Sequence, residues 1–138
     1  MSKITITRPV IVKIRVTENY KRAAAAGLQA SVARLDAGLR QLEGQAARLR
    51  SLEKQNPAGV EAAGQKLDAE RRACLQKRQE LLEELKNLGR LAPGDEVVHA
   101  RVESIVDVQV GDDWRKLMGA EIVLEDGIVV EIRTGGKD

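Results

Sequence analysis

The sequence predicts an α+β protein in which a long antiparallel coiled-coil helical hairpin is joined to a small antiparallel β-sheet or barrel. Apolar and polar residues alternate in residues 1–16, apolar residues follow a heptad pattern in residues 17–92, and alternation returns within residues 93–138. A spacing of two is typical of a strand with one buried face, and sustained heptads are typical of helices packed along their length. We expect the N-terminal strand to join the C-terminal module in one sheet.

The N-terminal strand is predicted from alternation. Six apolar residues fall on even positions, at Ile4, Ile6, Val10, Val12, Ile14 and Val16. Pro9 cannot donate a hydrogen bond to a ladder, so it marks an edge, a bulge or a break. Residues 1–16 carry four basic side chains and no acid, whereas residues 93–138 carry 5 basic and 11 acidic ones. Opposite charges attract between neighbouring strands, which favours pairing of the two segments.

The first helix is expected from Thr17, a good N-cap, to about Leu52. Apolar residues then recur at spacings of three and four. The residues that we expect to pack in this seam are Leu28, Val32, Leu35, Leu39, Leu42 and Leu49. Such a seam needs a partner helix along its whole length.

The tip of the hairpin is expected at about residues 53–60, where Pro57 and Gly59 interrupt the helical pattern. The second helix is then expected from about Val60 to Leu88, with Gly89 as its C-terminal cap. Its packing residues are Leu67, Cys74, Leu75, Leu81, Leu82 and Leu85.

The second helix has a wider apolar stripe than one partner helix covers. Leu75 and Leu82 lie beside the seam, while Arg71 and Arg78 occupy heptad positions within it. We expect these arginines to snorkel or to pair with acids of the first helix such as Asp36 or Glu43, or to fix the register or the choice of partner. The wide stripe predicts a further helix contact, most simply in a homo-oligomer, a dimer or a tetramer.

The C-terminal module is predicted to contain three or four short strands. The alternating runs are Val98, Ala100, Val102, Val106, Val108 and Val110, then Ala120, Ile122 and Leu124, then Ile128, Val130 and Ile132. Asp126-Gly127 between the last two runs is a strong signal for a two-residue hairpin turn. About 45 residues are marginal for an independent sheet, which again favours recruitment of the N-terminal strand.

The segment "VGDDWRKLMG", residues 110–119, has two readings. Asp112 and Asp113 beside Trp114 resemble the start of an acid/base or metal site, but a turn uses the same residue types. No ordered calcium-loop spacing is present, and His99 is the only histidine in the chain. We therefore expect a turn or local cap that carries a short loop over one end of the sheet.

The stretch "VQVGDDWRKLMGAEIVLEDGIVVEIR", Val108 to Arg133, together with "VIVKIRVTENYK" near the N-terminus, resembles the YlqD family of small bacterial proteins. The resemblance implies a strand, a helical hairpin and a small β-module, and it supplies no catalytic residues. In some relatives the gene lies beside ribosome-maturation genes, which implies a link to RNA or the ribosome. The helices of this chain match the family only as coiled-coil patterns.

Several function classes have no support in the sequence. There is no phosphate-binding glycine loop and no metalloprotease or serine-hydrolase motif. A single cysteine excludes an internal disulfide framework and makes a thiolate zinc site implausible. No stretch approaches the length of a membrane span, and the N-terminus lacks the apolar core of a signal peptide. We expect a cytoplasmic protein that is not an enzyme, uses no cofactor and contacts no membrane.

The leading functional hypothesis is a non-enzymatic scaffold that self-associates through the hairpin and contacts a protein partner. The alternative is an RNA- or ribosome-associated factor that contacts phosphate through basic residues of the hairpin. The candidate phosphate contacts are Arg34, Arg40, Arg48, Arg50 and Lys54. The scarcity of aromatic residues argues against base stacking.

Two other protein classes join helical hairpins to β-structure. Secondary-channel transcription factors carry a close acidic pair at the hairpin tip, which "EKQNPAGVE" lacks. Prefoldin-like chaperones place their β hairpins between the helices, whereas here the strands lie at the chain ends. Both remain weaker hypotheses.

Overall fold

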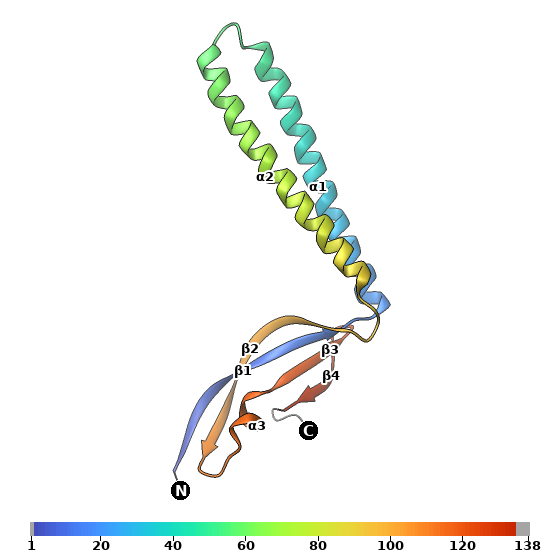
Figure 1. The fold of residues 1–138 in the computed structure, drawn as a ribbon, viewed down its shortest axis with the longest axis vertical. Helices are drawn as coiled ribbons and strands as arrows, with labels where there is room; N and C mark the ends of the chain where they lie inside the picture. Colours follow the sequence, from blue (N-terminus) through green and yellow to red (C-terminus); the bar gives the residue numbers. More distant parts are fainter. Residues whose placement is uncertain (1, 135–138) are drawn as a thin grey trace. The chain divides into compact units, whose positions relative to one another are not determined.

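The computed structural model describes residues 2–134. Its elements are β1 (Lys3–Arg15), α1 (Glu18–Ser51), α2 (Pro57–Arg90), β2 (Glu96–Gln109), α3 (Trp114–Met118), β3 (Glu121–Glu125) and β4 (Ile128–Arg133) (Figure 1). They form two compact units: a β-module of Met1–Lys21 with Leu91–Asp138, and a hairpin of Arg22–Arg90. The fold is therefore α+β, with two long helices and one sheet.

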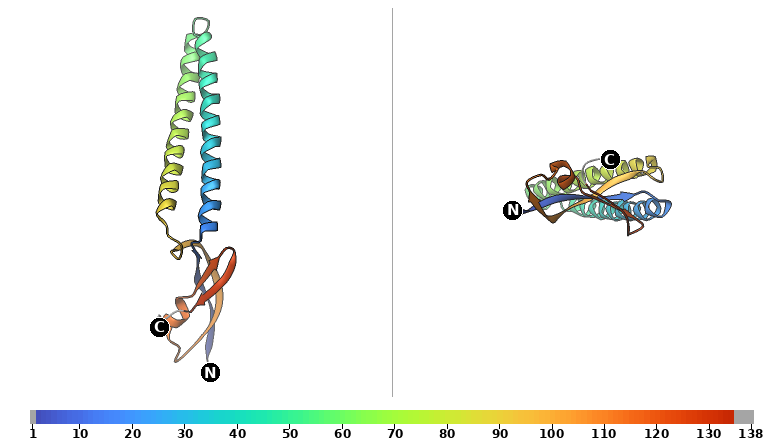
Figure 2. Two further views of the ribbon diagram at one scale, coloured as in Figure 1. Left: turned by 90° about the vertical axis from the view of Figure 1, so that its right-hand side faces the viewer. Right: turned by 90° about the horizontal axis from the view of Figure 1, so that it is seen from below.

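The sheet of the β-module has the strand order β2-β1-β3-β4. β1 is antiparallel to β2 and parallel to β3, and β3 is antiparallel to β4. The expectation of an all-antiparallel module is therefore wrong, because β1 and β3 are parallel. Of the two expected forms, sheet or barrel, the module is an open sheet. The two outer strands, β2 and β4, do not meet (Figure 2).

The core of the β-module lies around β3 and the C-terminal half of β1. Val10, Val12, Val16, Ala120 and Val123 are buried, and Val123 is fully inaccessible. β3 begins to pair with β1 only at Ile11, so residues Lys3–Val10 pair on one side alone, with β2. Pro9 lies in this one-sided part of β1. The Ile11 amide points to β3 and donates a hydrogen bond to the Ala120 carbonyl. Because backbone directions repeat every two residues, the Pro9 nitrogen points to the same side of β1, where β3 has not yet begun and no donor is needed.

Two register shifts change which residues share a face. On β2, Val12 pairs with Ala100 and Lys13 with Val98, which leaves His99 as an extra residue. Val98 is consequently 58% exposed, although alternation alone had placed it on the buried face with Ala100. On β4, Val130 is the extra residue, since Leu124 pairs with Val129 and Val123 with Glu131. One bulge residue reverses the faces of everything beyond it.

Local signals set the ends of the helices. Thr17 caps α1 as expected, because its hydroxyl accepts a hydrogen bond from the Tyr20 amide at 3.0 Å. α2 begins at Pro57 rather than Val60, with Asn56 as the N-cap that accepts from the Gly59 amide at 3.2 Å. Proline suits the first helical position because that amide has no partner in any helix. α2 also continues through Gly89 to Arg90, and the positive φ after it belongs to Gly94.

Within the hairpin, α1 and α2 run side by side in opposite directions (Figures 1 and 2). Residues 52–56 form the turn between them. No residue of α1 is buried, and only Leu81 and Leu88 are buried in α2. One described ion pair joins the helices, from Arg78 Nε to Asp36 Oδ1 at 2.7 Å.

Candidate interaction sites

The predicted packing residues of the hairpin form a stripe that is covered only in part. Leu81 is buried and Leu75 is 40% exposed. The others are half-buried: Leu28, Val32, Leu35, Leu39, Leu42, Leu49, Leu67, Cys74, Leu82 and Leu85. Ideal two-helix packing sequesters such positions more completely, so a single hairpin leaves apolar surface on both helices.

Small residues open a gap between the helices near the tip. Ala46 and Gly64 face this gap, which has a volume of about 200 Å³ and is walled by Leu49, Val60 and Leu67. A neighbouring hollow of about 310 Å³ is bordered by Glu43 and Arg71. Arg71 is exposed, and no described ion pair includes it, whereas Arg78 pairs with Asp36 as expected. Packing is therefore looser towards the tip than near Leu81.

The five predicted phosphate contacts, Arg34, Arg40, Arg48, Arg50 and Lys54, are all exposed. Arg34 donates a hydrogen bond to the Ser31 hydroxyl, and the other four enter no ion pair described for residues 2–134. At 3.6 residues per turn, Arg34 and Arg48 fall on one side of α1, while Arg50 lies about 160° from Arg34. The structure therefore does not gather all five on one face, and only the last three are close together in sequence near the tip.

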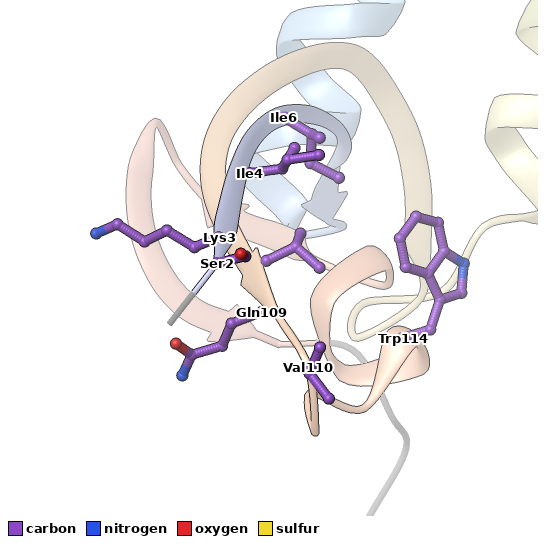
Figure 3. Close-up of a pocket in the computed structure, with 8 residues that line it drawn as sticks. Ser2, Lys3, Ile4, Ile6, Gln109, Val110 and Trp114 are labelled. Atoms are coloured by element: carbon purple, nitrogen blue, oxygen red, sulfur yellow. The ribbon is translucent and has the colours of Figure 1, made fainter.

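An apolar hollow of about 490 Å³ lies at the end of the β1–β2 ribbon (Figure 3). Its apolar lining consists of Ile4, Ile6, Val108, Val110 and Trp114. Figure 3 shows Lys3 and Gln109 extending to the side opposite Trp114, as alternation along a strand requires. Trp114 is 59% exposed and Val110 94% exposed. The hollow is an open and mainly apolar surface, with Ser2, Lys3 and Gln109 as the polar residues of its described lining.

The paired aspartates beside this hollow are structural, as the turn reading predicted. Asp112 accepts a hydrogen bond from the Gln109 amide at 2.8 Å, and Asp113 caps α3 by accepting from the Arg115 amide at 3.0 Å. Gly111 supplies the positive φ of the turn. Within residues 2–134 no cluster of three metal-ligating side chains occurs.

A charge network crosses all four strands, and the sequence patterns did not reveal it. Arg133 on β4 contacts Glu131 at 2.6 Å, Glu96 on β2 at 2.7 Å and Glu121 on β3 at 3.4 Å. Arg15 on β1 contacts Glu131 at 2.8 Å and Glu96 at 3.4 Å. Lys13 contacts Glu121 at 2.9 Å. The only sequence signal was the opposite charge of the two β segments.

The network keeps its carboxylates ionised. Hydrogen bonding to Arg133 lowers the pKa of Glu96 to about 2. The pKa of Glu131 is lowered chiefly by Arg133, and that of Glu121 chiefly by Lys13. A general acid near neutral pH needs the opposite shift. These carboxylates therefore join strands and are poorly suited to proton transfer.

No helix in the described part of the chain has an apolar stretch long enough to cross a bilayer. Comparison with curated proteins finds no match. Among solved structures, the chain is similar to a crystal structure of a protein of unknown function from Synechococcus sp. WH 8102. The two share 23% sequence identity with a TM-score of 0.72, over 96% of this chain and 95% of that one. At this identity the likeness shows a common fold. The YlqD protein family model matches residues 4–133, nearly the whole chain, and the chain thus belongs to the YlqD family.

Proposed function

We propose that this protein is a non-enzymatic scaffold that self-associates through its helical hairpin and presents its surfaces to a protein partner. The observation that carries the proposal is the incomplete burial of the helix stripe. Its leucines, Cys74 and Val32 are mostly half-buried in the single chain, and Leu75 is exposed. Burial of apolar surface is the main favourable term in association. A second hairpin packed on this stripe would bury the apolar surface that a single chain leaves exposed.

The test is the mass in solution, measured by light scattering across micromolar concentrations and a salt series. We expect a dimer or tetramer whose mass does not depend on salt, because apolar contacts are not screened. Leu75→Glu should shift the population to monomer. Gln76→Glu introduces the same charge one residue away, off the stripe, and should leave the mass unchanged. A wild-type monomer throughout this range contradicts the proposal.

A second candidate function is contact with RNA phosphate at the hairpin tip. It is supported by the exposure of Arg48, Arg50 and Lys54, none of which enters an ion pair described for residues 2–134. Binding through such residues weakens steeply with salt and shows little sequence preference. Bulk cellular RNA should then bind at low salt, and the triple change of these residues to Gln should remove most of that binding.

The matched control removes three exposed basic side chains, Lys66, Arg72 and Lys86, from α2 by the same change to Gln. If both triple variants lose binding equally, the contact depends on net charge and the tip is not a site. Absence of RNA binding by the wild type at low salt eliminates this candidate.

A further inference from the structure

The outer side of β2 carries a free backbone edge. β2 is the end strand of the sheet, and within residues 2–134 no strand lies beyond it. Ile11 of β1 bonds towards β3, so the even-numbered residues of β1 bond towards β2. They pair with even-numbered residues of β2, from Ala100 to Val108. The amides and carbonyls of the odd-numbered residues between them therefore point outward, namely Arg101, Glu103, Ile105 and Asp107.

Both ends of this edge are closed. At one end the outward-facing backbone of Gln109 is already bonded, because its amide donates to the Asp112 carboxylate and its carbonyl accepts from the Asp112 amide. At the other end His99 is the bulge residue, which interrupts the regular register. The free segment thus runs from Arg101 to Asp107, and its midpoint is Ser104.

We propose that this segment pairs antiparallel with the same segment of a second copy, about a two-fold axis at Ser104. In that register Arg101 lies opposite Asp107 of the other copy, and the pair occurs twice by symmetry. On the other face Val102 meets Val106, and Ala100 meets Val108. The partner is a second copy because the charges of the segment complement themselves about its own centre.

Neighbouring registers fit less well. Only outward-facing residues can pair with each other, so the neighbouring registers move the two-fold axis by one residue along β2. An axis at Glu103 sets Glu103 opposite Glu103 of the other copy. An axis at Ile105 sets Glu103 opposite Asp107. The remaining register with matched charges, centred on Val102, pairs the bulged His99 with Ile105. Only the axis at Ser104 uses the whole free segment without like charges directly opposite.

The exposed apolar residues of the strand support this interface. Ile105 is 74% exposed and Val102 46% exposed, on opposite faces of an edge strand of 14 residues. Long edge strands without protection readily add another strand. The interface lies wholly within the β-module. It can therefore be tested separately from association through the hairpin.

Cysteine cross-linking tests the register. Ser104 directs its backbone to β1, so across the proposed axis it forms a non-hydrogen-bonded pair with Cα atoms about 4.5 Å apart, within disulfide reach. In full-length protein carrying Cys74→Ser, we expect Ser104→Cys to form a disulfide dimer rapidly with oxidised glutathione. Gln109→Cys, whose equivalents lie roughly 33 Å apart along the paired strands, should not do so. Val102→Cys serves as the off-register control.

Slow cross-linking of Ser104→Cys, equal rates for Ser104→Cys and Gln109→Cys, or a faster rate for Val102→Cys overturns the proposal. Ser104 also accepts a hydrogen bond from Arg8 at 2.9 Å, so a measurement without substitution is needed beside it. Hydrogen exchange of the wild-type amides supplies one. Protection of Arg101, Glu103, Ile105 and Asp107 should rise with protein concentration, whereas Val102, Ser104 and Val106 should be protected throughout. Protection of the four outward amides that does not change with concentration refutes the pairing.

Charge reversal gives a third readout. Arg101→Glu places an acid opposite Asp107 of the other copy and should weaken the concentration dependence of exchange roughly tenfold. Arg115→Glu makes the same change outside the edge strand and should have no such effect. Equal behaviour of the two variants counts against the register.

Discussion

The β-module and the hairpin are stabilised in different ways. The β-module buries Val16 and Val123 almost completely and joins its four strands by a charge network. The hairpin contains far longer helices, yet only Leu81 and Leu88 are buried in it, and one described ion pair connects α1 with α2. Regular secondary structure is therefore a poor guide to how much of a core a segment can build alone. The β-module buries its core residues within one chain, whereas most packing residues of the hairpin are only half-buried.

The largest effect is expected at the hairpin, from Leu81→Ala. This side chain is 7% exposed, and its truncation should lower the free energy of unfolding by about 2–5 kcal/mol. Leu75→Ala, at a position 40% exposed, should cost about 1 kcal/mol or less in a single chain. Urea unfolding followed by helical circular dichroism checks both. If Leu81→Ala and Leu75→Ala lower the free energy of unfolding equally at low protein concentration, the hairpin does not have a buried side and an exposed side.

A smaller loss is expected at the β-module from Val123→Ala. Val123 is fully buried, and removal of its two methyl groups should cost roughly 2 kcal/mol. Val98→Ala is the matched control, since the bulge leaves Val98 58% exposed, and its cost should stay within about 0.5 kcal/mol. Fluorescence of Trp114, the only tryptophan, reports on the β-module. Destabilisation by Val98→Ala as large as that by Val123→Ala would contradict the described register.

Acid should weaken the β-module through its charge network. Glu96 has a pKa of about 2 in the folded chain against an ordinary value near 4.5. A lowered folded pKa stabilises the fold above the ordinary value, and this contribution is lost as pH falls from about 4.5 towards 2. A titration of the Glu96 carboxyl by NMR should show this low pKa, and Arg133→Met should raise it. Arg115→Met, outside the network, should leave it unchanged. If Glu96 titrates at its ordinary value in the wild type, the network does not exist in solution.

The smallest effect is expected from Asp36→Asn in the hairpin. Its ion pair with Arg78 is more than one-third exposed on both sides, and such pairs contribute about 0.5 kcal/mol. Asp68→Asn removes an exposed carboxylate with no described ion pair and is the control. If Asp36→Asn costs several kcal/mol, the polar contact between the helices is the dominant one, and the apolar stripe is not.

Much of the fold followed from periodicity. The N-terminal strand, the turn at Asp126-Gly127 and the cap at Thr17 are confirmed, because each depends on residues adjacent in sequence. The parallel pairing of β1 with β3 was not predictable in this way. Alternation shows that a strand has one buried face, but the same alternation fits a parallel or an antiparallel neighbour.

The candidate sites were less predictable than the fold. The bulges at His99 and Val130 leave no mark in the alternation pattern, yet they decide the exposure of Val98 and one limit of the free edge of β2. The charge network joins residues from all four strands, so only the topology brings Arg15 and Arg133 to the same carboxylates. Proline predicts an interruption of a helix, yet Pro57 is the first residue of α2, because the same residue type suits both positions.

The inner position of β1 has a consequence for synthesis. β1 is made before the hairpin, but both of its neighbours, β2 and β3, follow the entire hairpin in sequence. At a translation rate of roughly 5–20 residues per second, on the order of 4–16 seconds pass between the synthesis of β1 and the synthesis of β2. The helices form from local contacts meanwhile, and their formation shortens the flexible loop that β1 and β2 must close. The β-module thus cannot complete its sheet until the hairpin and then β2 and β3 have been made, and a chain interrupted within α2 carries β1 without its neighbours.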